Sequence, residues 1–203
     1  MAPQEISLYP AVTVRESLRL FGGLHGLRRQ PLAAAITEVT DALCLGGFVD
    51  TRIASLSGGQ QRRAQAAAAL LHRPPLLLLL DEPTAGVDPQ TRRALLAALR
   101  QRAADGAAIV YTTHYLPELA DLHATLAVAR DGRVIARGTA QQLLSALPGQ
   151  VTLDLGDEVL RVPATDTAAT LAQLLTTISK PLRGVSVTEP SLDDLYQALA
   201  NAA

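Results

Sequence analysis

Two adjacent carboxylates at the end of an aliphatic run are the first residues in this sequence with types and spacing suited to catalysis. Asp81 and Glu82 directly follow Leu76–Leu80 and precede Pro83. One carboxylate could hold a hydrated Mg²⁺, because that ion accepts one or two carboxylates together with phosphate oxygens. The other could orient a water molecule and accept its proton. A solvated acidic turn would explain the same pair, so these residues alone do not define a site.

A glycine-rich stretch upstream of the carboxylates could bind an anion. Ser57, Gly58 and Gly59 precede an alanine-rich segment that predicts a helix over Gln60–Leu71. The glycines allow the backbone to approach a ligand closely. The free amides and the positive end of the helix dipole would face the same anion. Ser57 could equally be only the N-cap of that helix, so the alternative stays open at this point.

Two further polar residues lie at the ends of predicted elements. Asp88 precedes Pro89, which is the combination of a helix N-cap and a proline at the first helical position. His114 follows the predicted strand Ala108–Thr112. A histidine has a pKa near 6.5 and suits structural, solvated and catalytic roles, so its residue type alone does not choose among them.

The elements that must position these side chains alternate between strands and helices. Leu76–Leu80 is too short for an independent helix, and we expect a strand buried on both faces, as in a parallel sheet. Ala108–Thr112 and Thr125–Ala129 predict two more strands. A helix beginning at Asp88 and ending near Ala104 separates the first two. This alternation favours a doubly wound α/β core.

The regions on either side of this core have different patterns of predicted helices and strands. Residues 7–71 predict a small helical subdomain, in which Thr13 and Glu16 form a capping box. After Pro148 the pattern changes to a small α+β appendage. Its expected elements are a hairpin around Gly156-Asp157, a helix over Thr167–Ile178, a strand over Val185–Thr188 and a closing helix capped by Ser191 and Asp194.

Composition excludes several classes of protein. The chain has 203 residues, a formal net charge of −1 and a single cysteine, Cys44. It therefore has no long-range field for nucleic acid or anionic lipid, and no disulfide framework. No export signal opens the sequence, and no aliphatic run reaches the roughly 20 residues needed to span a bilayer. We expect the chain to be soluble by itself.

The string Leu-Ser-Gly-Gly-Gln-Gln-Arg at positions 56–62 resembles the signature loop of the ATP-binding cassette (ABC) ATPases. Other motifs follow in the family's order, and together they extend the resemblance from Ala2 to about Leu147. The Leu76–Glu82 stretch is similar to the Walker B strand, and Ala85–Pro89 is similar to the D-loop, with Val87 where leucine is usual. His114 resembles the switch histidine, and Gln4 resembles the glutamine of the Q-loop.

The resemblance implies a role for each matching residue. Glu82 would be the catalytic base and His114 would contact the γ-phosphate and the attacking water. Asp81 would belong to the Mg²⁺ shell, and Gln4 would touch the metal and the water. The residues implied to bind ATP held by a second subunit, or to shape that facing site, are Ser57, Gly58, Gly59, Gln60 and Asp88.

The implied fold is an incomplete P-loop-type parallel sheet with a helical subdomain and a small C-terminal α+β appendage. The nucleotide-binding domain would cover residues 1–147, with the helical subdomain at about 7–71 and the sheet core at about 72–147. The appendage would cover residues 148–203. Within it, Glu189–Leu199 is similar to the tail of cassettes that serve drug, lipid and polysaccharide exporters, or is a terminal helix that merely packs.

One family motif cannot occur in these residues. A Walker A loop requires Gly-Lys-Ser/Thr, and the only lysine, Lys180, is followed by Pro181. The first hypothesis is therefore an ATPase subunit of an ABC exporter truncated before the Q-loop and inactive alone. The second is a non-catalytic partner that donates only its signature loop to an intact subunit. A soluble cassette ATPase of DNA repair or translation is disfavoured, because no coiled coil, zinc insert or second cassette is visible.

The first hypothesis also implies ligands, partners and a place in the cell. The ligands would be ATP and Mg²⁺. The partners would be a second nucleotide-binding subunit, in a homo- or heterodimer, and a transmembrane permease, with no nucleic acid. The chain would lie in the cytoplasm, at the inner face of the membrane, through its permease. The cargo cannot be read from this sequence, because selectivity belongs to the membrane subunit.

Overall fold

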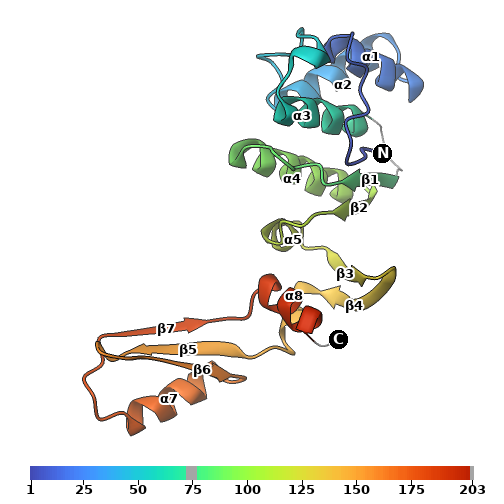
Figure 1. The fold of residues 1–203 in the computed structure, drawn as a ribbon. Helices are drawn as coiled ribbons and strands as arrows, with labels where there is room; N and C mark the ends of the chain where they lie inside the picture. Colours follow the sequence, from blue (N-terminus) through green and yellow to red (C-terminus); the bar gives the residue numbers. More distant parts are fainter. Residues whose placement is uncertain (72–76, 202–203) are drawn as a thin grey trace. The chain divides into compact units, whose positions relative to one another are not determined.

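The computed structural model describes residues 1–71 and 77–201 (Figure 1). The chain forms two compact units, Met1–Glu118 and Leu119–Ala203. The domain boundary expected near residue 147 stays a prediction. None of the helices within the described ranges is both long and apolar enough to cross a bilayer.

Three helices at the start of the first unit pack on one another, as Figure 1 shows. They are α1 (Val14–Leu24), α2 (Arg29–Ala42) and α3 (Gly58–Leu70). The capping box predicted for Thr13 and Glu16 is confirmed at the start of α1. Helix α2 has an apolar face, in which Ile36, Val39 and the C-cap residue Leu43 are all buried.

Helix α3 is the most deeply buried of the three. Every residue from Ala64 to Leu70 is buried, because small alanine side chains let neighbouring elements approach on all sides. The helix starts at Gly58, two residues before the predicted Gln60, and Ser57 is its N-cap. The predicted stop at Pro74-Pro75 lies outside the described residues.

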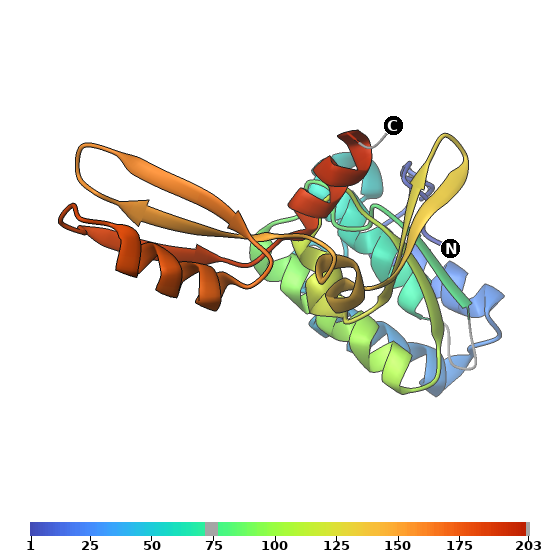
Figure 2. The same ribbon diagram turned by 90° about the horizontal axis from the view of Figure 1, so that it is seen from below.

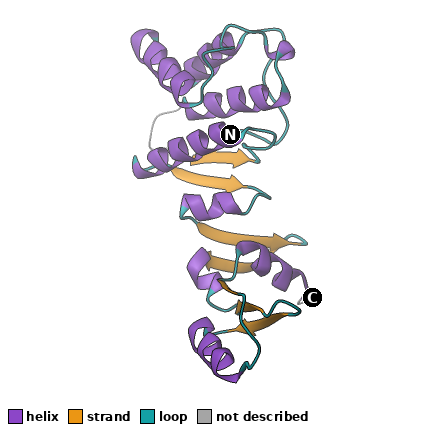
Figure 3. Ribbon diagram, turned by 90° about the vertical axis from the view of Figure 1, so that its left-hand side faces the viewer, coloured by secondary structure: helices purple, strands orange, loops and turns teal. Residues whose placement is uncertain are grey.

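Two parallel strands, β1 (Leu77–Asp81) and β2 (Ala108–Thr112), form the sheet of the first unit (Figure 3), and β1 ends at Asp81. Their register pairs Asp81 with Thr112. Helix α4 (Pro89–Ala104) connects them, and its predicted Asp88 cap and Pro89 start are confirmed. On the other side of β1, Ala2 forms a parallel bridge with Leu80, so the N-terminal segment runs along the strand.

The prediction that the first strand is buried on both faces is wrong. Leu78 and Leu80 are buried, but Leu77 is 54% and Leu79 36% exposed. Val110, which pairs with Leu79 on β2, is 52% exposed on the same face. An aliphatic run shows that a strand is apolar, but it carries no information about which face lacks a covering layer.

The third predicted strand does not extend the parallel pair. In the second unit, β3 (Thr125–Arg130) pairs antiparallel with β4 (Arg133–Thr139). The turn at Asp131-Gly132 joins these two strands, and its residues have positive φ angles of 49° and 74°. The short helix α5 (Pro117–Leu122) precedes this hairpin and contains the boundary between the two units.

The rest of the second unit matches the expected α+β appendage (Figure 2). Strand β5 (Gly149–Asp154) lies between β6 (Val159–Ala164) and β7 (Gly184–Thr188), and both pairings are antiparallel. Helix α7 (Thr167–Thr177) packs against β5 through a small core centred on Val151 and Leu153. The remaining helices are α6 (Ala140–Leu144) and α8 (Leu192–Asn201), the latter begun by the predicted capping box of Ser191 and Asp194.

A candidate catalytic edge at the end of the parallel strands

Asp81 and Glu82 lie at the carboxyl end of β1, where open α/β sheets place their ligands. Thr112, at the end of β2, holds both residues. Its hydroxyl donates to Oδ1 of Asp81, and the Glu82 amide donates to the Thr112 carbonyl at 3.1 Å. Thr112 was not among the predicted site residues, although its place beside the carboxylates follows from the parallel register.

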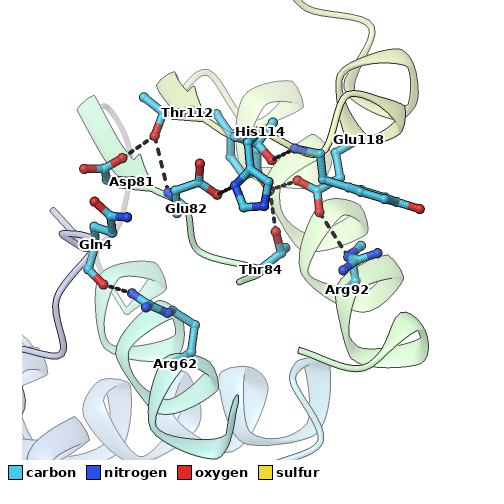
Figure 4. A network of polar contacts seen from close by, with 12 residues as sticks. Gln4, Arg62, Asp81, Glu82, Thr84, Arg92, Thr112, His114 and Glu118 are labelled. Carbon is cyan, nitrogen blue, oxygen red and sulfur yellow. Dashed lines mark hydrogen bonds and ion pairs between the residues drawn. The ribbon is translucent and has the colours of Figure 1, made fainter. Parts of the chain in front are cut away.

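Glu82 has a left-handed backbone, with φ at 49°. This conformation brings Cβ close to the following carbonyl and costs roughly 1–2 kcal/mol for a residue other than glycine. The bonds from its amide to Thr112 and from the Ala85 amide to its carbonyl hold the turn in place. Because the chain leaves the pleat of the strand here, the Glu82 side chain points toward the loop that follows β2 (Figure 4).

His114 meets Glu82 in that loop. Its Nδ1 lies 2.8 Å from Oε2 of Glu82, and the histidine side chain is 79% exposed while that of Glu82 is 16% exposed. When Nδ1 carries the proton and donates to the carboxylate, Nε2 is left facing solvent and Oε1 of Glu82 is left as an acceptor. The pair can therefore contact a ligand through one atom of each side chain.

Gln4 reaches the same edge from the N-terminal segment. The Ala2 amide donates to the Leu79 carbonyl at 2.8 Å, and the Asp81 amide donates to the Ala2 carbonyl at 2.9 Å. Arg62 of α3 donates to the carbonyl of Gln4. These contacts place Gln4 beside Asp81 (Figure 4).

The glycine-rich loop lies against the predicted D-loop of the same chain. A Cβ added to Gly59 would lie 2.6 Å from the Gly86 carbonyl oxygen, so this position requires glycine for packing. Arg63 pairs with Asp88 at 3.5 Å and reinforces the contact. The two loops that were predicted to share one function are therefore neighbours.

The start of α3 combines local capping with amides that can accept a ligand. The Gln60 amide donates to the Ser57 hydroxyl, and the Ser57 amide donates to Oε1 of Gln60 at 2.9 Å, so the N-cap alternative is correct as a description of the fold. Ser57 and Gly58 are exposed. The amides of Gly58 and Gly59, at the first two helical positions, have no acceptor within the helix and remain able to bind an anion.

Asp88 also caps a helix. It accepts from the amide of Thr91 at 3.0 Å and from its hydroxyl at 2.7 Å. These bonds, together with the charge of Arg63, lower the pKa of Asp88 below its ordinary value. Asp88 is thus held as an anion on the loop that contacts Gly59.

A buried polar cluster underlies the histidine loop, and no pattern in the sequence predicts it. Glu118 is 1% exposed, yet its Oε2 accepts from the Tyr111 hydroxyl at 2.6 Å and its Oε1 lies 3.1 Å from Nε of Arg92. Arg92 also stacks over the ring of Tyr115 at 4.2 Å. Burial, followed by the bond to Glu118, raises the pKa of Tyr111. The cluster fixes both ends of the loop that carries His114.

The side chains at this edge fit part of a Mg²⁺–nucleotide site. The carboxylates of Asp81 and Glu82 and the amide of Gln4 supply oxygen donors of the type that Mg²⁺ prefers, and this ion needs few protein ligands. Within residues 1–71 and 77–201, no group of three or more histidine, cysteine or acidic side chains is arranged to hold a metal. The edge can bind a hydrated cation and accept a proton from water.

Comparisons with known proteins find ATP-binding relatives of this chain. Residues 35–121 match a family model described as "AAA domain, putative AbiEii toxin, Type IV TA system". The chain is 37% identical over 155 residues to the linearmycin resistance ATP-binding protein of Bacillus subtilis, which covers 76% of this chain and 50% of that protein. It is 35% identical over 180 residues to the Nod factor export ATP-binding protein I of Burkholderia lata, covering 89% of this chain and 56% of that protein.

A solved ATP-binding subunit of an ABC transporter has the same fold. The superposition covers 98% of this chain and 67% of the solved subunit, with a TM-score of 0.70 and 24% sequence identity. The chain spans about half the length of the curated relatives that it matches.

Proposed function

Because the chain belongs to the family of ABC transporter ATP-binding proteins, we propose that it provides the hydrolytic edge of an ATPase that drives export. The observation that supports this most directly is the meeting of Asp81, Glu82 and His114 at the end of β1. One relative is named for linearmycin resistance and another for Nod factor export, which favours an exporter. The cargo remains open, since no residue described here would contact it.

In this proposal Glu82 is the catalytic base. Its side chain is held by a strained turn and by His114, and it retains a free acceptor oxygen for a water molecule. His114 presents Nε2 outward, where it can contact a terminal phosphate. Asp81, oriented by Thr112, and Gln4 would hold Mg²⁺, which when bound neutralises the charge of the phosphates.

The glycine loop has a different target in the proposal. The amides of Gly58 and Gly59, with Ser57 and Gln60, would grip ATP bound mainly by a second nucleotide-binding subunit, and Asp88 would shape that facing site. The exposure of Ser57 and Gly58 supports this, because a buried loop could not reach a second subunit. A permease would anchor the assembly at the cytoplasmic face of the membrane.

The phosphate cradle must come from residues other than these 203. The sequence contains no Gly-Lys-Ser/Thr, and the exposed apolar face formed by Leu77, Leu79 and Val110 is a surface that further protein could cover. We propose that a Walker A segment and the structure around it complete the site, and that these residues alone do not hydrolyse ATP. The competing proposal is a non-catalytic partner that donates only Ser57–Gln60 to an intact subunit.

Nucleotide binding separates the two proposals. ATP binding should be measured by calorimetry for this chain and for a version extended upstream in its gene. The first proposal expects Mg²⁺-dependent binding only after extension with an in-frame Gly-x-x-x-x-Gly-Lys-Ser/Thr. Stable expression of the 203-residue chain and ATPase activity only on mixing with an intact cassette would favour the second.

The role of Glu82 is tested in whichever assembly hydrolyses ATP. Glu82→Gln should lower turnover by about 100-fold or more, since general-base catalysis contributes that much, while leaving ATP binding intact. Glu158→Gln, an exposed position in the second unit, is the matched control and should retain full turnover. Turnover by Glu82→Gln at the unsubstituted rate would contradict the assignment.

A further inference from the structure

One buried amide holds the segment that carries Gln4. Gln65, in the middle of α3, is only 3% exposed. Its Oε1 accepts from the Ser7 amide at 2.6 Å and from the Ser7 hydroxyl at 3.2 Å. Its Nε2 donates to the carbonyls of Pro3 at 2.7 Å and Glu5 at 3.2 Å. The segment from Pro3 to Ser7 is therefore bonded to α3 on both sides of Gln4.

The same segment is bonded to β1 on its other side. The two backbone bonds of Ala2 join it to Leu79 and Asp81. Arg62, one turn before Gln65, adds a bond from its guanidinium to the Gln4 carbonyl. Gln4 thus lies between the strand that carries the carboxylates and the helix that begins at the glycine loop.

Packing of α3 does not require an amide at this position. All the other residues from Ala64 to Leu70 are alanine or leucine, and a buried polar group is costly unless it is hydrogen-bonded. Gln65 makes four such bonds, all to the segment that contains Gln4 and none to another part of α3. The side-chain hydrogen bonds of Gln65 therefore hold the N-terminal segment.

We propose that Gln65 is a positioning residue that ties Gln4 to the helix of the glycine loop. A shift of α3 that follows ligand binding at Ser57–Gly59 would pull the Pro3–Ser7 segment and move Gln4 relative to Asp81. The two ends of the site are then coupled through one side chain. This inference rests on the proposed function, in which Gln4 contacts the metal.

The direct test is the exchange rate of the Ser7 amide, measured by NMR on the full chain. Gln65→Met keeps the length and apolar volume of the side chain but makes none of its hydrogen bonds. We expect Ser7 exchange to accelerate by about tenfold or more, the scale set by a lost buried hydrogen bond. Ser7→Ala removes only the hydroxyl contact at an exposed position, so it cannot unfold α3, and should produce a smaller acceleration.

Gln61→Met is the matched control on the same helix. Gln61 directs its side-chain hydrogen bonds to the carbonyls of Ile53 and Leu56 instead of to the N-terminal segment. We expect Ser7 exchange to be unchanged in this variant. Equal acceleration in Gln61→Met and Gln65→Met, or none in Gln65→Met, would overturn the coupling whether or not the protein hydrolyses ATP.

A second readout reports on positioning rather than on folding. In an assembly that hydrolyses ATP, Gln65→Met should raise the Mg²⁺ concentration for half-maximal turnover severalfold, while the maximal rate at saturating Mg²⁺ changes little. A loss of maximal rate with an unchanged Mg²⁺ requirement would overturn the link from Gln65 to Gln4. If neither the upstream-extended chain nor a mixture with an intact cassette hydrolyses ATP, while Ser7 exchange changes as expected, the proposed function is overturned and the structural tie stands.

Discussion

Two glutamates near the end of β2 have opposite surroundings. Glu118 is buried, hydrogen-bonded to Tyr111 and ion-paired with Arg92, whereas Glu82 adopts a left-handed backbone and meets one exposed histidine. Glu118 has its charge balanced within the fold. Glu82 keeps an oxygen available and is held in a conformation that its residue type disfavours.

This difference distinguishes a structural glutamate, Glu118, from a candidate catalytic one, Glu82. A buried carboxylate that is ion-paired within the fold stabilises the loop around it, but its burial keeps a ligand from reaching it. A carboxylate on a strained turn at a strand end has capacity left for a ligand and lowers stability instead. The loop between β2 and α5 therefore carries His114, the partner of the candidate catalytic group, while Tyr111 in β2 and Glu118 in α5 hold its two ends.

Removing the buried carboxylate of Glu118 tests this contrast with the largest expected effect. Glu118→Ala would leave the Arg92 charge and the Tyr111 hydroxyl without their partner. Because that partner is almost fully buried, we expect the free energy of unfolding to fall by about 3 kcal/mol, measured with urea. Glu38→Ala, which removes an exposed partner of Arg102, should cost far less. Similar losses in the two variants would refute the contrast.

A smaller change tests one bond of the cluster. Tyr111→Phe leaves Oε2 of Glu118 without a donor and should cost about 1.5 kcal/mol. Because the folded pKa of Tyr111 is raised, its contribution to stability is complete below about pH 10, the pKa of an unfolded tyrosine, and is lost as the pH rises further. Subtracting the phenolate absorbance of Tyr111→Phe from that of the unsubstituted chain should give no ionisation of this residue until well above that pH.

Much of this region follows from local sequence signals. The capping boxes at Thr13 and Ser191 and the start of α4 at Asp88 depend on residues within four positions of one another, and all three are confirmed. The order of strands and helices could be predicted for the same reason, because each element carries its own periodicity and its own boundary residues.

The contacts that the sequence did not reveal join distant segments. Thr112 lies beside Asp81 only because β1 and β2 share a parallel register. Gln65 reaches Ser7 across 58 positions, and nothing in an alanine-rich helix predicts which polar residue is buried. The exposure of Leu77 and Leu79 depends on what packs above the sheet, and an aliphatic run contains no information about its neighbours.

Substitutions in the Glu118 cluster should lower the free energy of unfolding. At Glu82, by contrast, the strained backbone should make glycine more stabilising than alanine. Glu82→Gly and Glu82→Ala both remove the contact with His114, but only glycine adopts a φ of 49° without penalty. We therefore expect Glu82→Gly to be about 1 kcal/mol more stable than Glu82→Ala in urea unfolding. Equal stability would mean that the turn at Glu82 stores no strain, and the contrast with Glu118 would then depend on burial alone.

Asp88 combines features of Glu82 and Glu118. Its side chain is exposed, as a ligand-binding group would be, but it is hydrogen-bonded within the fold, as a structural group is. The bonds from Thr91, and then the charge of Arg63, lower its folded pKa, so its contribution to stability is complete above the unfolded value of about 3.9 and is lost as the pH falls through the lower folded value. The substitution Asp88→Asn keeps a side chain that can cap α4 but cannot titrate.

The difference in unfolding free energy between the unsubstituted chain and Asp88→Asn should therefore be constant above about pH 5 and decrease below about pH 4. Thermal unfolding across this range provides the measurement. A difference that stays constant to about pH 3, on the order of one unit below the unfolded pKa, would show that Asp88 stabilises α4 through geometry and not through charge.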